Sequence, residues 1–278
     1  MSPFREVSLT ALREIRRNLG STKGIAMSVL FFLGGLLPSA LLLAATKIAG
    51  APGIDPAEGV RLIEESLKAQ GKSAEVAHHL ATQPPQLELL LRGTFSFAPF
   101  LILLIGFDQI AGDIQHRAIR YIAGRSRRET IVIGKAVGLW GVVTALLLVL
   151  NLTVWILTLI QGWSPVLNVL SWGPRVWLFS TCACAAWVGL ISLISSFFKT
   201  PIVALFAGAP VFFALWLTHL ILNHYLHDSA VRWAFPFRFE ELLQSHKPLE
   251  VLAGGVASIA WGAVMVAMAT VVVKKRDI

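Results

Sequence analysis

The sequence has few charged residues. Only 14% of its 278 residues are Asp, Glu, Lys or Arg, and 55% are hydrophobic, whereas soluble domains carry about 25% charged residues. This scarcity excludes an ordinary soluble domain and indicates an integral membrane protein. At about 20 apolar residues per span, with room for loops, the length predicts roughly six transmembrane helices in one membrane domain.

Cysteine and the common catalytic motifs are also scarce or absent. The two cysteines, Cys182 and Cys184, lie two positions apart in an apolar run, so on a helix they face different sides and form neither a disulfide nor a metal site. The sequence contains no Gly-x-x-x-x-Gly-Lys-Ser/Thr phosphate loop, no Gly-x-Ser-x-Gly elbow and no His-Glu-x-x-His pair. It therefore contains no motif for binding ATP itself and none for hydrolase chemistry.

The apolar runs predict an all-α integral membrane protein. Residues 1–24 have the pattern of an amphipathic interfacial helix, with Phe4, Ala11 and Ile15 on one face and arginines elsewhere. A cleaved signal peptide is the alternative to a first span at residues 25–46, because residues 49–51 resemble a cleavage box, but the basic and apolar segments before them are longer than a signal needs. We expect transmembrane helices at 25–46, 93–112, 131–160, 174–198, 201–222 and 251–273.

Polar segments separate these helices. Residues 47–92 predict a small external helical loop, with one helix starting near Asp55 and Pro56 and a second starting at Ser73 and stopping before Pro84. Residues 161–173 predict a turn and a short Trp-rich interfacial piece. Residues 223–250 predict an external amphipathic segment with a short helix at 238–243 on the membrane surface.

The distribution of basic residues predicts the orientation. Fifteen of the 24 Lys and Arg residues, but only five of the 16 acidic ones, fall on the side that holds both termini and the loop at 113–130. Positive charge concentrates in cytoplasmic loops, so we expect a multi-pass protein of the cell (inner) membrane with both termini in the cytoplasm. The basic residues flank apolar spans, which favours membrane lipids, and not nucleic acid, as their partner.

The loop at 113–130 carries a further pattern. Asp113 is followed by an apolar helix, then by Arg128, and the stretch closes with Gly134 and Lys135. With six spans, a surface helix and a larger external loop after the first span, the chain resembles the permease subunits of ABC transporters of type 2. Two positions depart from that family's loop pattern: Arg117 and Ala118 replace a Gly-Thr pair, and Arg125 replaces a proline.

The resemblance implies what the loop does. In that family it holds a coupling helix that docks on a separate ATPase subunit and transmits ATP-driven closure to the membrane domain. It implies two ATPase subunits that bind ATP and Mg²⁺, no cofactor on this non-catalytic chain, and a second permease copy, identical or related, with substrate passing between spans one, two and five. The alternative is a basic loop that only sets topology. The residues implied in coupling are Asp113, Arg117, Ile119, Arg120, Tyr121, Ile122, Arg128 and Lys135.

Two polar features inside or beside the spans need separate interpretations. Asp108 lies in the second expected span, where a carboxylate needs a partner. We interpret it as an ion pair at the inner gate, with a cytoplasmic arginine or Lys135 as partner, or else as a proton or substrate site. His224, His227 and Asp228 share a helical spacing that would suit a metal, but an interfacial hydrogen-bonding cluster is the more common use.

The sequence thus predicts the permease subunit of an ABC transporter, exporting an amphipathic molecule, a lipid or a lipid-linked glycan. Two other classes remain open. One is a secondary carrier driven by protons through Asp108, although no inverted repeat is evident. The other is a membrane assembly factor whose external segment recruits a partner.

Overall fold

Long helices make up nearly all of the chain in a computed structural model, which describes residues 2–48, 56–69, 73–116, 127–162, 164–225 and 230–276. No strand occurs in these ranges. The helices are α1 (Pro3–Gly20), α2 (Thr22–Ile48), α3 (Pro56–Ala69), α4 (Ala74–Ala81), α5 (Pro85–Gly106), α6 (Ala111–Gln115), α8 (Arg128–Gln161), α9 (Val166–Phe197), α10 (Pro201–Tyr225), the 3₁₀ helix η1 (Ala230–Ala234), α11 (Pro236–Leu243) and α12 (Pro248–Lys275).

Many helix starts follow from local sequence. Proline suits the first helical position, because its missing N–H would have no partner there. The predicted cap of α4 is confirmed, since the Ser73 hydroxyl accepts a hydrogen bond from the Val76 N–H. Asp55 and Gly71, expected to begin and end the first external helix, lie outside the described residues. The helices that start at proline begin at Pro3, Pro56, Pro85, Pro201, Pro236 and Pro248.

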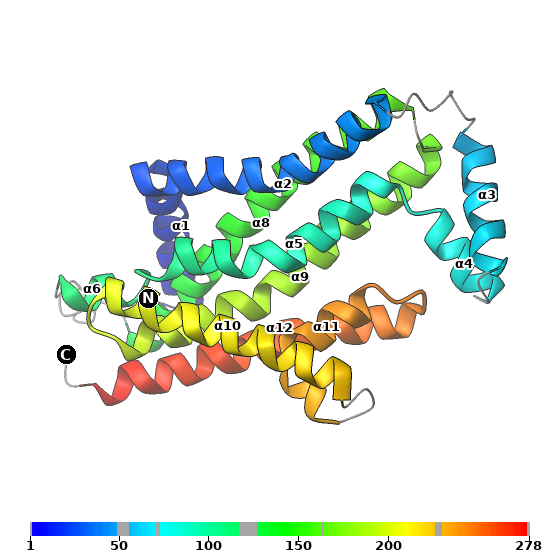
Figure 1. The fold of residues 1–278 in the computed structure, drawn as a ribbon. Coiled ribbons are helices and arrows are strands. Elements are labelled where there is room, and N and C mark those ends of the chain that lie inside the picture. The colour runs from blue at the N-terminus through cyan, green and yellow to red at the C-terminus, as the bar shows by residue number, and fades with distance from the viewer. Residues whose placement is uncertain are drawn as a thin grey trace.

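The predicted membrane fold is confirmed. Five helical segments of the described chain are long and apolar enough to cross a membrane, namely 85–115, 128–160, 166–197, 201–222 and 248–275. A sixth candidate is the bent pair α1 and α2, which meet at 75°. The bend sets α1 across the bundle while α2 runs along it (Figure 1).

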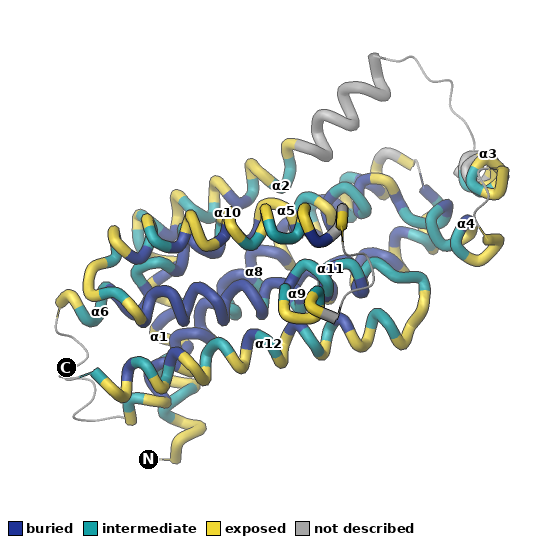
Figure 2. The backbone as a smooth tube through the Cα atoms, turned by 60° about the horizontal axis from the view of Figure 1, so that its bottom comes forward, coloured by how far each residue is buried: buried dark blue, intermediate teal, exposed yellow. Residues whose placement is uncertain are grey.

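Helix α9 forms the centre of the bundle. In its apolar stretch 78% of residues are buried, against 17% in α10 and 22% in α12. Helices α5 and α8 pack on α9 from one side and α12 from another, which leaves α10 and α12 with long exposed faces (Figure 2). The exposed apolar side chains of α10 and α12 are those expected to face lipid or a partner helix.

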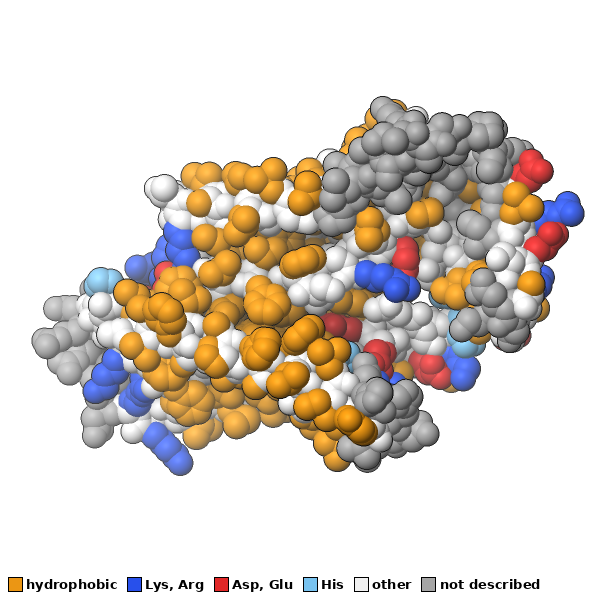
Figure 3. Space-filling view, in the orientation of Figure 1, with side chains coloured by type: hydrophobic (Ala, Val, Ile, Leu, Met, Phe, Trp, Pro, Cys, Tyr) orange, Lys and Arg blue, Asp and Glu red, His pale blue; other side chains and the backbone are white. Residues whose placement is uncertain are grey.

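The two ends of the bundle differ in charge. Helix α6 and both termini gather at one end, and the α3–α4 pair covers the other (Figure 1). Lys and Arg side chains dominate the visible face of the first end, whereas acidic and basic side chains mix at the second (Figure 3). Between them the visible surface is largely hydrophobic, as a bilayer requires.

Two long helices start earlier than the sequence predicts. Helix α5 begins at Pro85, not at residue 93, because Pro84 and Pro85 start a helix as readily as they end one. The turn expected after residue 161 falls between α8, which ends at Gln161, and α9, but the interfacial piece expected after that turn belongs to α9, which runs unbroken from Val166 and contains Pro174. The short helix expected at 238–243 is present as α11, which begins two residues earlier, at Pro236, and buries Phe239, Glu240, Leu242 and Leu243.

The second expected span is interrupted near its end. Helix α5 stops at Gly106, and turns at 107–110 lead into α6. Ser195 of α9 supplies the missing backbone partners: its hydroxyl oxygen accepts from the N–H groups of Ile110 and Ala111, both at 3.1 Å, and its hydroxyl donates to the Phe107 carbonyl at 2.9 Å. A broken helix is tolerated inside a membrane protein only where such groups are satisfied.

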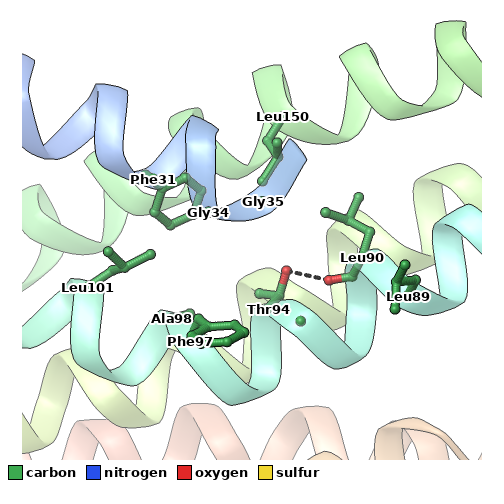
Figure 4. A pocket seen from close by; sticks show the side chains of 11 residues that line it. Phe31, Gly34, Gly35, Leu89, Leu90, Thr94, Phe97, Ala98, Leu101 and Leu150 are labelled. Atoms are coloured by element: carbon green, nitrogen blue, oxygen red, sulfur yellow. Dashed lines mark hydrogen bonds between the residues drawn. The ribbon is translucent and has the colours of Figure 1, made fainter. Parts of the chain in front are cut away.

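Helices α2 and α5 meet across a shallow apolar contact (Figure 4). Phe31 and Gly35 of α2 face Thr94 and Ala98 of α5, with Leu150 of α8 behind them. The cavity between them holds about 20 Å³, close to the about 10–15 Å³ that one water needs. It is packing between two spans and too small for a transported molecule.

Candidate functional site

Helix α1 lies directly against α8 along a row of glycines. A Cβ added at Gly134 would lie 2.6 Å from Thr10 Cβ, and one added at Gly138 would lie 2.7 Å from Glu14 Cβ. Such contacts leave no room for a side chain, so glycine is what allows the two helices to touch. Phe4, on the other face of α1, is 83% exposed. The amphipathic helix thus packs on α8 with one face and presents apolar groups with the other.

A buried cluster of charges joins α1, α6 and α8. Lys135 is 4% exposed, and its ammonium lies 2.7 Å from Asp113 Oδ2 and 3.5 Å from Glu14 Oε2. It also donates a hydrogen bond to the Gln109 carbonyl at 2.6 Å. The ammonium therefore has one carbonyl acceptor and two carboxylates within ion-pair distance, which compensate its buried charge.

Arg17 completes this cluster. Its guanidinium lies 2.6 Å from Glu14 Oε1 and 3.4 Å from Asp113 Oδ1, and the Asn18 amide donates to Glu14 Oε1 at 3.2 Å. Two carboxylates and two cations balance, so the four groups carry no net charge together. We call Glu14, Arg17, Asp113 and Lys135 the charge cluster.

The charge cluster ties both ends of the loop at 113–130 to α1. Asp113 lies where the loop leaves α6, and Lys135 lies two turns into α8, so two of the predicted coupling residues contact each other. At the same end, Glu6 of α1 accepts hydrogen bonds from the Thr130 hydroxyl at 2.9 Å and the Arg127 N–H at 3.3 Å. The first turn of α8 is therefore held by α1 at two points.

Arg128, another predicted coupling residue, has contacts of a different kind. Its guanidinium donates to the carbonyls of Arg276 at 3.0 Å and Lys274 at 3.4 Å, at the end of α12. Carbonyls at the end of a helix lack hydrogen-bond partners within that helix, and the Arg128 guanidinium donates to two of them here. The other residues named for the loop pattern lie outside the described residues. They are Arg117, Ile119, Arg120, Tyr121, Ile122 and Arg125.

Asp108 forms an ion pair, but not with the expected partner. Its carboxylate lies 2.8 Å from the Lys23 ammonium of α2, whereas Lys135, one expected partner, binds the charge cluster. Lys23 also donates to the Ile105 carbonyl at 3.1 Å and lies 4.1 Å from the Phe107 ring centre. The sequence could not identify Lys23, because the α1–α2 bend that brings it to α5 is a tertiary feature.

A large cavity lies at the opposite end of the molecule. It measures about 540 Å³ and lies between α4, α5, α9 and α12. Its depth is apolar, and its rim carries Arg92, Arg175, His79 and His246. Arg92 contacts Glu88 at 2.5 Å, and Arg175 lies over the Trp172 ring, 5.4 Å from its centre. We call this the outer cavity; it combines an apolar body with a rim of net positive charge.

The positive groups on the rim affect the pKa of His79, a histidine of α4. Burial, followed by the nearby positive groups of His246 and Arg175, lowers the pKa of His79 below its ordinary value. His79 is therefore neutral at neutral pH and gains a charge only in acid.

The weak metal candidates find no support in the described part of the chain. His227 and Asp228 lie outside the described residues, and so does the side chain of His224. Among the described residues, no group of three His, Cys, Asp or Glu side chains is placed to hold a metal ion.

Comparison with known proteins decides the family. Residues 10–278 match the model of the family described as "ABC-2 family transporter protein". The chain belongs to the ABC-2 transporter family. No curated protein matches the chain in a sequence search. Because the family match covers all six candidate spans, it confirms the resemblance that the loop and the span order indicated.

Membership gives this ABC-2 chain its general role. It is a multi-pass membrane permease subunit of an ABC transporter, and it associates with an ABC ATPase partner. In this permease, sequence reasoning missed Glu14, Arg17 and Gln109 as partners of the loop. The only local signal was the spacing of Glu14 and Arg17, three positions apart and thus able to pair on one helix.

Proposed function

We propose that this permease subunit belongs to an ATP-driven exporter, and that the loop at 113–130 is where the ATPase acts. The observation that carries the proposal is the charge cluster, which fastens both ends of this loop to α1. A push on the loop would then move α6, α8 and α1 together. Because α1 continues into α2 through a sharp bend, the same push would reach the first span.

The charge at the α6 end supports a cytoplasmic position for the loop. Basic residues gather at that end, beside both termini (Figure 3), and positive charge favours the cytoplasmic side of a membrane. An ATPase in the cytoplasm would find the loop within reach. The inner membrane, with both termini inside, is the location that fits this arrangement.

The exposed faces of the spans support a second permease copy, with one ATPase below each. Helix α10 exposes Phe206 by 74% and Phe213 by 57%. Helices α2, α5 and α10 share one side of the bundle, the spans between which the family resemblance places the substrate path. Two copies facing each other there would enclose that path.

The coupling proposal predicts a selective loss of ATPase binding. The chain carrying Ile119→Asp, Tyr121→Asp and Ile122→Asp together should insert normally but lose its ATPase, since charged groups cannot fill an apolar docking groove without a desolvation cost. We expect the co-purifying ATPase to fall at least about tenfold, because three lost apolar contacts exceed the 1.4 kcal/mol of a tenfold change. The measurement is extraction of the tagged chain in mild detergent, mass spectrometry of its companions and vanadate-sensitive ATP turnover.

A control places an aspartate at the other end of the molecule. Leu62→Asp changes a half-exposed leucine of α3 and should leave both companions and turnover unchanged. Unaltered ATPase recovery in the triple variant would remove the loop assignment. Transport that persists without ATP but stops when the proton gradient is dissipated would support the carrier that uses Asp108.

The outer cavity supports an amphipathic cargo with an acidic head group. Its apolar depth along α9 and α12 suits an acyl chain or similar tail, and its arginines suit phosphate or carboxylate. A lipid or a lipid-linked glycan has both parts. The cavity is also about 540 Å³, within the about 300–1,000 Å³ typical of ligand sites.

This cargo class predicts a charge-dependent affinity. Arg92→Gln with Arg175→Gln should weaken the binding of a fluorescent phosphatidic acid in zwitterionic nanodiscs about tenfold or more, since hydrogen bonds to charged groups contribute about 1.5–3 kcal/mol each. Arg61→Gln, an exposed charge of α3, is the control. Equal affinity in the double variant would contradict the assignment.

A further inference from the structure

A second cavity holds a buried carboxyl group that no described cation neutralises. Glu240 of α11 is 6% exposed, and its Oε1 accepts a hydrogen bond from the Trp187 indole N–H at 2.8 Å. The nearby arginines are engaged by the adjacent residue: Arg232 and Arg238 bind Glu241 at 2.5 and 2.9 Å. Within the described chain, Glu240 therefore has a neutral donor and no ion-pair partner.

This carboxyl lines a cavity surrounded by aromatic rings. The cavity measures about 160 Å³, lies between α5, α9, α10 and α11, and is lined by Glu240 together with Phe100, Trp187, Phe212, Trp216 and Phe237. Trp187 is the hub, with ring centres of Phe212 and Phe237 both 5.2 Å from its own. One water molecule needs about 10–15 Å³ of such volume, so a cavity of about 160 Å³ admits a small head group.

The cavity is accessible from outside the bundle. Phe100 is 44% exposed and Trp216 is 45% exposed, so they form its mouth between α5 and α10. Trp187 and Phe212, at 1–2% exposure, form its floor beside Glu240. A ligand entering there would pass between two rings and meet the carboxyl at the far side.

A buried carboxyl group surrounded by aromatic rings favours a particular class of ligand. A carboxylate buried without a cation is costly, so it either binds a proton or attracts a positive ligand. Ring faces attract cations through their quadrupole, best when the cation is weakly hydrated, as alkylated ammonium groups are. A hydrated sodium ion would instead need several oxygen ligands, and the described lining offers few. We propose that Glu240 and the surrounding rings form a binding site for an organic ammonium group.

Protonation of the Glu240 carboxyl should make ligand binding depend on pH. Burial raises the pKa of the Glu240 carboxyl to about 8, so near neutral pH a proton competes with the ligand. The other titratable groups near it are His219 of α10, Cys184 of α9 and Glu241, which forms ion pairs with Arg232 and Arg238. Binding should therefore strengthen as pH rises from 6 to 9, because more of the carboxyl is then ionised.

The test measures tetramethylammonium binding to the purified full chain in nanodiscs by titration calorimetry, against sodium chloride at equal ionic strength. We expect saturable binding to the unaltered chain and at least tenfold weaker binding to Glu240→Gln, whose amide keeps the shape and still accepts from Trp187. Glu250→Gln, an exposed carboxyl at the start of α12, should bind as the unaltered chain does.

A second variant keeps the test decisive if Glu240→Gln does not fold. Trp216→Leu removes a half-exposed ring at the mouth and should weaken binding about three- to tenfold. No saturable heat with tetramethylammonium, equal heat with sodium, or unchanged binding in both variants would overturn the assignment. This test does not depend on the direction of transport or on the cargo proposed for the outer cavity, because it measures tetramethylammonium binding to the purified permease alone.

Discussion

Replacing Lys135 with glutamine should destabilise the permease more than almost any other single substitution. The change leaves Glu14 and Asp113 facing a single cation, Arg17, in a site where Lys135 is 4% exposed. Removing one member of a buried ion pair costs about 3–5 kcal/mol, because the remaining charge stays buried without compensation. We expect a clearly lower midpoint of thermal unfolding in detergent and a smaller yield of monodisperse protein.

The charge cluster allows a compensating variant. Glu14→Gln combined with Lys135→Gln leaves Asp113 with Arg17, so the balance of charge returns and much of the lost stability should return with it. Such a recovery is the signature of direct coupling between the two sites. Lys247→Gln, which removes an exposed cation near the start of α12, is the control and should change stability by less than about 0.5 kcal/mol. Purely additive losses in the double variant would contradict the cluster.

The second large effect is expected where α9 and α12 touch. A Cβ added at Gly189 would lie 2.6 Å from the Gly262 Cα, so the added methyl group meets backbone that no side-chain rotation can move. Gly189→Ala should therefore force the two helices apart and cost about 1–3 kcal/mol, and a larger side chain should cost more. The measurement is again the unfolding midpoint, together with the size-exclusion profile.

Gly93 of α5 is the matched control for this substitution. A Cβ there would have nothing within 4 Å, and alanine favours a helix over glycine by about 1 kcal/mol. Gly93→Ala should thus be neutral or stabilising while Gly189→Ala is destabilising. The opposite order would show that the α9–α12 contact does not limit stability.

Much of the helical framework could be predicted from local sequence. Apolar runs long enough to cross a bilayer occur in few places, and prolines such as Pro201 and Pro248 mark where helices start. Boundaries failed where a local signal has two uses. Helix α4 does stop before Pro84 and Pro85, as predicted, but the same pair also starts α5, eight residues before the expected span. The sequence predicts the start of a span at Pro174, which lies inside α9.

The candidate sites divide in the same way. Asp113 and Lys135 could be selected because they belong to a loop pattern, but their contact with each other and with Glu14 could not. Asp108 was expected to need a cation, yet which one depended on how α2 packs. Glu240 and Glu241 are neighbours in an amphipathic segment, and no local rule says which of them is buried.

By itself, the sequence determined that this protein is an all-α membrane protein with five or six spans, because hydrophobic length and charge scarcity act on each segment independently. It also determined the family, since a match over residues 10–278 needs only residue order. Only the tertiary structure decided the partners of the charged groups. A buried charge is satisfied by whatever group lies within a few ångströms of it, and that depends on which helices the whole fold brings together.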